Sequence, residues 1–240
     1  MGNSIVSRTS GYTLINEFNK KKNCKQIACC VLCTFFIITF SVLSLNFYFD
    51  NRDTKAQQIH LSFGNQTNNI VVTWSTNKKY QNTLNLFSKD KEQYISTFVG
   101  NSYHFVSDSY HQQYIHRVDI TDLDYDARYF YNIDNAYSSS NFFNFKTPSE
   151  NLEDTTNLIA FGDLGYSNDI SVDALTQEIN TGMYDAILHI GDFAYNLDSE
   201  SGHNGDNFLN LIQPFAANIP YMTCPGNHES ANNFSDYIHR

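Results

Sequence analysis

The chain has 240 residues, of which 41% are hydrophobic and 15% aromatic, so it can form packed cores and wholesale disorder is excluded. Its formal net charge of −10 is unevenly placed along the sequence. Residues 1–26 carry five basic side chains and one acidic side chain, whereas residues 50–240 carry ten basic and 24 acidic ones. An acidic body repels polyanions, which argues against nucleic acid as a partner.

An apolar run covers residues 27–49 and contains no Asp, Glu, Lys, Arg or His. As a helix these residues would extend over roughly 34 Å, which is long enough to cross a bilayer. Lysines at the end of residues 1–26 predict that this tail stays cytoplasmic, so the run is interpreted as a transmembrane signal anchor with a lumenal or extracellular body. The alternative is a signal peptide cleaved near Ser44, which would make the protein secreted.

Two N-glycosylation sequons begin at Asn65 and Asn233, and both are consistent with a body outside the cytoplasm. The body contains one cysteine, Cys224, so no disulfide is expected within it.

Residues 56–147 are rich in alternating and β-branched patterns. These patterns predict strands over residues 58–63, 70–75, 83–88, 94–99, 114–120, 129–133 and 142–145. Several short strands at this spacing indicate a fibronectin III-like β-sandwich, with Trp74 in its core. The histidines of this region are interpreted as ordinary surface or cross-strand residues: His60, His104, His111 and His116. Further along the chain, His203 is interpreted as a loop residue and His189 as a packed or edge residue.

From residue 156 onward the pattern changes to βαβαβ. Short apolar strands are predicted over residues 157–161, 184–190 and 220–224, and helices over residues 171–179 and 206–217. The predicted fold class is therefore an α+β two-domain chain: a β-sandwich followed by half of an α/β sandwich, preceded by a transmembrane helix.

Oxygen-bearing side chains follow each of the three predicted parallel strands. Asp163 follows the first strand, Asp192 and Tyr195 follow the second, and Asn227 follows the third. Because the carboxyl ends of parallel strands meet at one edge of a sheet, these side chains are expected to converge there. Carboxylate and phenolate oxygens suit a trivalent iron, and two ions sharing a carboxylate can activate water and hold a phosphate oxygen.

Three motifs in this order resemble those of metallophosphoesterases: GDxG at residues 162–165, GDxxY at residues 191–195 and GNH(D/E) at residues 226–229. Tyr195 makes the chain similar to the purple acid phosphatases, in which this tyrosine binds iron. Residues 56–75 and 145–148 resemble the start and end of that family's N-terminal domain, and residues 205–222 look like its animal-type long form. The resemblance implies the first half of a metallophosphoesterase catalytic domain over residues 156–240.

The resemblance also implies roles for individual residues. Asp163 would bind the ferric ion, Asp192 would bridge Fe(III) and a divalent Fe, Zn or Mn, Tyr195 would supply the phenolate, and Asn227 would bind the divalent ion. His228 would be catalytic and would donate a hydrogen bond or a proton to the phosphate or the leaving group. Glu229 would orient His228 or cap the following loop.

One departure from the family pattern concerns histidines. The family completes its metal site with later motifs of the VxxH and GHxH kinds, whereas this sequence ends 12 residues after His228 and its remaining histidine, His239, lies in a different context. A fragment or truncated product is therefore expected. The first hypothesis is an acid phosphatase that hydrolyses phosphate monoesters, with weak or no activity in this chain alone. The second is an inactive remnant that acts as a membrane-displayed binding module. The third is another metallophosphoesterase, such as a phosphodiesterase.

Overall fold

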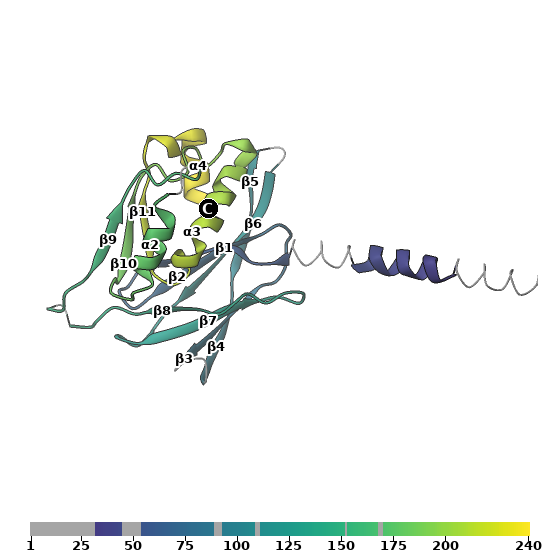
Figure 1. The fold of residues 1–240 in the computed structure, drawn as a ribbon. Helices are drawn as coiled ribbons and strands as arrows, with labels where there is room; N and C mark the ends of the chain where they lie inside the picture. The colour runs from purple at the N-terminus through teal and green to yellow at the C-terminus, as the bar shows by residue number, and fades with distance from the viewer. Residues whose placement is uncertain (1–31, 45–53, 89–92, 109–110, 152, 168–169) are drawn as a thin grey trace, which may run out of the picture. The chain divides into compact units, whose positions relative to one another are not determined.

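The structure is a computed structural model, and it describes residues 32–44, 54–88, 93–108, 111–151, 153–167 and 170–240 (Figure 1). The chain divides into two compact units, Met1–Asp50 and Asn51–Arg240. The second unit holds both the predicted β-sandwich and the predicted parallel sheet, so these two parts form one compact unit.

In the first unit, residues 32–44 form a helix with exposed apolar side chains, Phe36 and Phe40 among them. This helix covers the middle of the predicted anchor, and residues 27–31 and 45–49 lie outside the described part of the chain. No helix among the described residues has the length and apolar character that a membrane crossing requires. The transmembrane anchor therefore stays a prediction.

The predicted β-sandwich is confirmed as two four-stranded antiparallel sheets. One sheet has the order β1-β2-β6-β5 and the other the order β4-β3-β7-β8 (Figure 1). The strands are β1 (Gln57–Phe63), β2 (Ile70–Thr76), β3 (Thr83–Ser88), β4 (Gln93–Val99), β5 (Asn101–Asp108), β6 (His111–Ile120), β7 (Arg128–Asp134) and β8 (Phe143–Lys146).

Buried apolar side chains from both sheets form one core, in which Trp74 of β2 is 1% exposed, as predicted. Strand β5 was missed by the sequence prediction. Phe105 is its one fully buried side chain, and the other residues of β5 are polar or exposed. An edge strand of this kind carries no alternating apolar signal, so periodicity does not detect it.

The second part of this unit is a three-stranded parallel sheet of order β11-β10-β9, with β9 (Leu158–Phe161), β10 (Ala186–Ile190) and β11 (Tyr221–Cys224). The helices α2 (Val172–Ile179) and α3 (His203–Ala216) connect the strands, and their apolar faces pack against them in a second core. The short helices η1 (Glu200–Gly202) and η2 (Asn227–Glu229) and the terminal helix α4 (Ala231–His239) complete the fold. The βαβαβ order is thus confirmed, whereas α4 was not predicted.

A bulge in β1 joins the sandwich to α3. The register between β1 and β2 shifts between Gln57 and His60, and Gln58 has a left-handed φ of 58°. The bulge lets two successive N–H groups face the helix, which a regular strand does not allow. The N–H of Gln58 donates to Asn210 Oδ1 at 3.2 Å, and that of Ile59 donates to Gln213 Oε1 at 3.0 Å.

His116 of β6 is buried and stacks across the sheet on Trp74, with ring centroids 5.3 Å apart. Its Nε2 lies 2.8 Å from Thr76 Oγ1 and accepts from Asn82 Nδ2 at 3.3 Å. Burial lowers its pKa from the ordinary 6.5 to about 4. His116 is therefore the predicted cross-strand residue, but it is held in its neutral form.

The substitution His116→Gln tests the consequence for stability. Between about pH 4 and 6.5 the unfolded chain binds more protons at this position than the folded chain does, so stability falls as the pH falls through this window. From pH 7.5 to 5.0 His116 alone is expected to lower the free energy of unfolding by about 2 kcal/mol. Denaturant unfolding at pH 7.5 and pH 5.0 measures the loss of unfolding free energy on acidification. In His116→Gln this loss should be about 2 kcal/mol smaller than in the unmodified chain. The exposed His104→Gln serves as the control, and an equal loss in both variants would contradict the assignment.

Candidate metal centre

The loops that follow β9, β10 and β11 lie together at one edge of the parallel sheet. The N–H of Asp163 donates to the carbonyl of Gly191 at 3.1 Å, and that of Gly165 donates to the carbonyl of Phe193 at 2.7 Å. The N–H of His228 donates to Asp192 Oδ1 at 3.1 Å. The first loop thus contacts the second, and the second contacts the third, as the strand order requires.

Two glycines allow this close approach. A Cβ added to Gly191 would lie 2.8 Å from the Cα of Gly226, and a Cβ added to Gly226 would lie 2.2 Å from Asp192 Oδ1. Both distances are shorter than van der Waals contact permits, so side chains at these positions would push the loops apart. Gly191 also has a φ of 71°, which favours glycine over other residues.

Asp163 and Tyr195 meet directly across the loops. The phenol Oη of Tyr195 donates to Asp163 Oδ1 at 3.1 Å. Asp163, Asp192 and Tyr195 all have left-handed φ angles, of 56°, 51° and 52°. Such conformations are strained for residues with side chains and cluster at functional sites, where they direct side chains out of the regular backbone path.

The electrostatic environment of Tyr195 raises the pKa of its phenol. Desolvation is the largest cause, followed by the hydrogen bond to Asp163 and by the negative charges of Asp163 and Asp192. The protein groups alone therefore favour the neutral phenol. A cation placed among these oxygens acts in the opposite direction and favours the phenolate.

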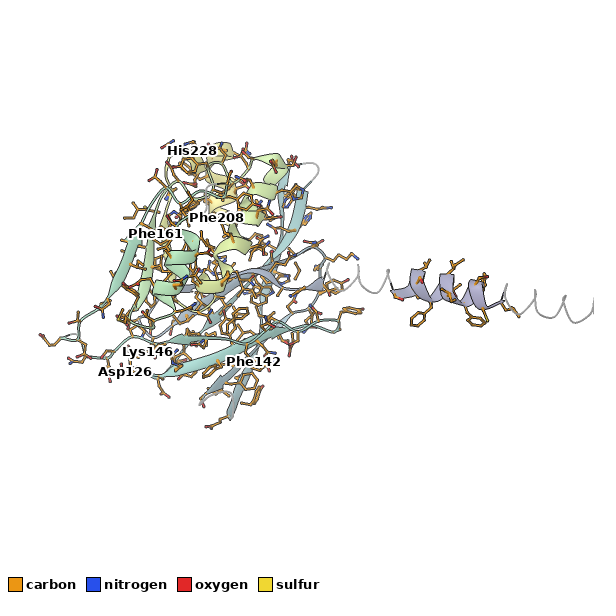
Figure 2. All side chains as sticks on the ribbon, viewed as in Figure 1. Asp126, Phe142, Lys146, Phe161, Phe208 and His228 are labelled. Atoms are coloured by element: carbon orange, nitrogen blue, oxygen red, sulfur yellow. The ribbon has the colours of Figure 1, made fainter. Side chains whose placement is uncertain are left out.

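Asn227 and His228 begin the third loop, in η2. The side chain of Asn227 is exposed. His228 Nδ1 lies 3.0 Å from Asn196 Oδ1, and its ring packs edge-on against Tyr195 with centroids 4.8 Å apart. Because Asn196 Oδ1 is an acceptor, Nδ1 carries the proton and Nε2 is left for another partner. Figure 2 shows His228 at the rim of the molecule.

Glu229 is the buried residue that fixes the loops. Its carboxylate accepts the N–H of Asp192 and of Phe193, both at 2.9 Å, and the N–H of Gly226 at 2.8 Å. Glu229 as a whole is 2% exposed. Glu229 was expected to orient His228 or to cap the loop that follows it. Its carboxylate instead accepts from Gly226, which precedes it, and from the loop after β10, so it ties the second loop to the third. The contact to the second loop, 36 to 37 residues away, could not be inferred from the sequence pattern.

Below the loops lies a cluster of aromatic rings around His189 of β10. Its ring contacts those of Phe161, Phe193, Phe208 and Tyr221. His189 is 1% exposed, and its Nδ1 forms a hydrogen bond with the Tyr221 hydroxyl. Burial lowers the pKa of His189 to about 4, although the charge of Asp192 and the backbone at Gly191 raise it in part. The prediction of a packed residue is confirmed.

The residues of the candidate centre offer a hard oxygen donor set: two carboxylates, one phenol and one amide. This chemistry fits a trivalent iron beside a divalent ion. Within the part of the chain that the structure describes, the later histidine ligands expected from the resemblance are not found near these donors. Among the described residues, the one close group of three His, Cys, Asp or Glu side chains lies elsewhere. His239 packs against the rings of Tyr103 and Phe105 in β5 and does not join the centre.

The structure thus brings Asp163, Asp192, Tyr195 and His228 into one contact network, with Asn227 in the adjoining loop; their roles as ligands or catalyst stay predictions. Asn196, the partner of His228, was missed, because its position follows only from the loop conformation. The sequon residues Asn65 and Asn233 are both exposed, so a glycan can be accommodated at either.

Comparisons with known proteins agree with this architecture. Residues 56–147 match the family described as "Purple acid Phosphatase, N-terminal domain", and residues 156–240 match "Calcineurin-like phosphoesterase". Acid phosphatase type 7 of Danio rerio is 40% identical over 77% of this chain and 42% of its own length. Fe(3+)-Zn(2+) purple acid phosphatase 12 of Arabidopsis thaliana is 28% identical over 72% of this chain and 38% of its own length.

A solved structure of a purple acid phosphatase from yellow lupin seeds has the same fold over 73% of this chain and 36% of its own, with a TM-score of 0.62 and 21% identity. The chain thus spans about two fifths of the length of the relatives that it matches.

The parallel sheet, the three loops and these matches define the class of the protein as a calcineurin-like phosphoesterase. Within that class, the chain belongs to the purple acid phosphatase family.

The substitution Glu229→Ala tests how the loops are held. It leaves three backbone N–H groups without their acceptor in a buried setting, so it is expected to lower the free energy of unfolding by roughly 3 kcal/mol. Glu229→Gln keeps one acceptor oxygen and should have a smaller effect. Denaturant unfolding measures both. The exposed Glu153→Ala is the control, with a change within about 0.5 kcal/mol. A Glu229→Ala variant as stable as this control would contradict the assigned role.

Proposed function

We propose that the chain provides part of the active site of an enzyme that hydrolyses phosphate monoesters at acidic pH. The observation that carries the proposal is the set of oxygen donors Asp163, Asp192, Tyr195 and Asn227 at the carboxyl edge of one parallel sheet, with Tyr195 hydrogen-bonded to Asp163. The family to which the chain belongs supports hydrolysis of a phosphoester as the general chemistry.

In the proposed centre, Asp163 and Tyr195 would hold Fe(III), Asp192 would serve both ions and Asn227 would hold the divalent ion. One relative carries Fe(3+) and Zn(2+) in its name, which supports this pairing, and Fe or Mn are the other candidates for the divalent position. When bound, such a pair supplies positive charge for the phosphate oxygens and lowers the pKa of water. Hydrogen bonds between the three loops hold these residues near one another before any ion binds.

His228 is proposed to act on the phosphate or on the leaving group. Its Nδ1 is engaged with Asn196, so Nε2 is the atom that faces a substrate. In the neutral ring this Nε2 is an acceptor, whereas in the charged ring it is a donor. The charged ring is the form able to donate a proton or a hydrogen bond to an oxygen of the ester. Tyr195 packs against the ring and limits its rotation.

The four donors do not complete a two-ion site, and the family's later histidine ligands have no counterpart among the described residues near them. We therefore propose that this chain alone has weak activity or none. The second candidate function is a binding module without catalysis, which the incomplete set of metal ligands favours. A phosphodiesterase is the third candidate, and the presence of Tyr195 in the site speaks against it.

Visible spectroscopy of the iron-loaded chain tests the metal assignment independently of turnover. Phenolate bound to Fe(III) absorbs visible light, so the chain is expected to become coloured with Fe(III) and Zn(II). Tyr195→Phe should abolish the band, and the exposed Tyr137→Phe should keep it. Iron bound with no visible absorption in the unmodified chain would remove Tyr195 from the centre and revive the phosphodiesterase hypothesis.

Hydrolysis of a chromogenic phosphate monoester at pH 5 separates the first two candidates. If the metal-loaded chain turns over, Asp192→Asn is expected to lower the rate by at least ~100-fold, since even partners of metal ligands contribute about 10- to 100-fold. Asp173→Asn, an exposed carboxylate in the first turn of α2, should leave the rate unchanged. Two bound ions without any turnover would support the binding module instead.

We also propose that residues 27–49 anchor the protein in a membrane with the body on the lumenal or extracellular side. The apolar run and the basic residues that precede it support this orientation. The full chain is expected to remain in the membrane fraction after extraction with alkaline carbonate. Release into the supernatant, with a new N-terminus near residue 45, would favour a cleaved signal peptide and a secreted protein.

A further inference from the structure

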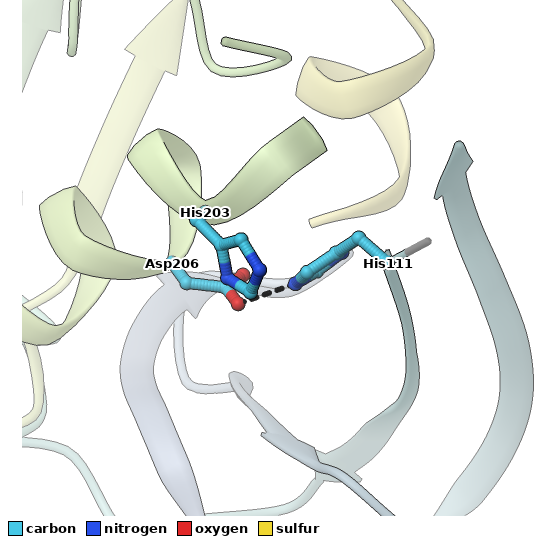
Figure 3. Close-up of side chains that lie close together, drawn as sticks. All are labelled: His111, His203 and Asp206. Carbon is cyan, nitrogen blue, oxygen red and sulfur yellow. Dashed lines mark hydrogen bonds and ion pairs between the residues drawn. The ribbon is translucent and has the colours of Figure 1, made fainter. Parts of the chain in front are cut away.

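Three potential metal ligands lie together away from the candidate metal centre. His111 begins β6, whereas His203 and Asp206 lie in the first turn of α3. One ligand atom from each residue lies within 4.8 Å of the other two. Figure 3 shows the two α3 side chains facing His111, with His111 Nε2 2.6 Å from Asp206 Oδ2.

The outcome differs from the sequence interpretation of these histidines. His111 was predicted to be a surface or cross-strand group, but it is 6% exposed and contacts α3. His203 was predicted to lie in a loop, but it is the first residue of α3, with its ring 4.7 Å from that of His111. The β6–α3 contact, which joins residues 95 positions apart, could not be inferred from the sequence pattern.

The orientation of Asp206 is fixed by a buried arginine. Arg240 forms an ion pair with Asp206 Oδ1, and its Nε donates to Asp236 Oδ1 at 2.9 Å. The side chains of Arg240 and Asp236 are 2% and 4% exposed. Arg240 therefore holds one oxygen of Asp206 and leaves Oδ2 directed at the histidines, in the way that an outer partner orients a metal-binding carboxylate.

The charges of this network are not balanced by the side chains that form it. Asp206 and Asp236 are two carboxylates served by the single guanidinium of Arg240. His111 is more than nine-tenths buried, and its Nδ1 has no hydrogen-bond partner in the part of the chain that the structure describes. Asp206, whose side chain is 19% exposed, thus shares its counter-charge with Asp236, and a bound cation can supply a further positive charge.

Two imidazoles and one carboxylate form a donor set that suits Zn²⁺ and its neighbours in the first transition series. We propose that His111, His203 and Asp206 bind one divalent transition-metal cation such as Zn²⁺, which links the β-sandwich to α3. The site is separate from the proposed phosphoesterase centre and does not depend on that activity.

Binding requires a small local rearrangement. Ligand atoms about 2.0 Å from a tetrahedral zinc ion lie roughly 3.3 Å apart, so His111 Nε2 and Asp206 Oδ2 must separate by less than about 1 Å as the ion replaces the proton between them. His203 is exposed, so its ring can rotate to present a nitrogen. Solvent supplies the remaining ligand and an entry path on the His203 side.

The test uses the 240-residue chain carrying Asp192→Asn. This substitution weakens the proposed phosphoesterase centre, so metal bound there is distinguished from metal bound by His111, His203 and Asp206. Zn²⁺ and Co²⁺ are titrated at pH 7.5, where imidazole ligands are deprotonated. One equivalent of metal is expected to bind, with the intense visible bands of a four-coordinate Co²⁺ ion. His203→Ala, which removes an exposed ligand, should weaken binding at least ~10-fold and abolish those bands.

The control is His104→Ala, an exposed histidine of β5 that pairs with Gln112. It should change the affinity less than about twofold. Excess Zn²⁺ should also raise the melting temperature of the His104→Ala variant by several degrees but not that of His203→Ala. No bound metal in the unmodified ligand set, or equal affinity in the two histidine variants, would overturn the proposal and leave His111 and Asp206 as a simple hydrogen-bonded pair.

Discussion

One buried carboxylate holds the candidate metal centre together. Glu229 accepts three backbone N–H groups, two from the loop after β10 and one from the loop after β11. Neither loop has regular secondary structure at this point to satisfy those donors, so without Glu229 they would be buried and unpaired. The positions of Asp192 and Asn227, on which any shared ion depends, follow from this carboxylate and from the contact between Gly191 and Gly226.

The two cores of the second unit are joined by polar contacts as well as by apolar packing. The bulge of β1 presents two N–H groups to α3, and the hydroxyl of Tyr131 donates to the carbonyl of Ala217 at 2.7 Å just after that helix. Buried hydrogen bonds of this kind require a defined geometry, so they fix how the sandwich lies against the parallel sheet. The network of Asp206, Arg240 and Asp236 lies at the same junction.

Sequence periodicity was sufficient for most of the fold. Strands such as β2 and β10 are buried β-branched or aliphatic runs. Because they are buried, their sequences show the continuous apolar pattern that predicts a strand. It failed for β5, whose single buried residue leaves no pattern, and for α4, in which three consecutive residues have left-handed φ angles. The donors of the centre were predictable because each follows a strand in sequence. The partners of Glu229 and His228 were not, because loop geometry alone determines them.

The bulge at Gln58 also affects the free edge of the β-sandwich. Strand β1 lies at the margin of its sheet, and an unpaired margin is a template on which another chain can add a strand and begin to aggregate. Here the side-chain amides of Asn210 and Gln213 accept two N–H groups of β1, and Leu61 forms an isolated parallel bridge with Pro220, so a foreign strand would have to displace these partners first. The same contact that assembles the two halves therefore protects this border of the sandwich from polymerisation.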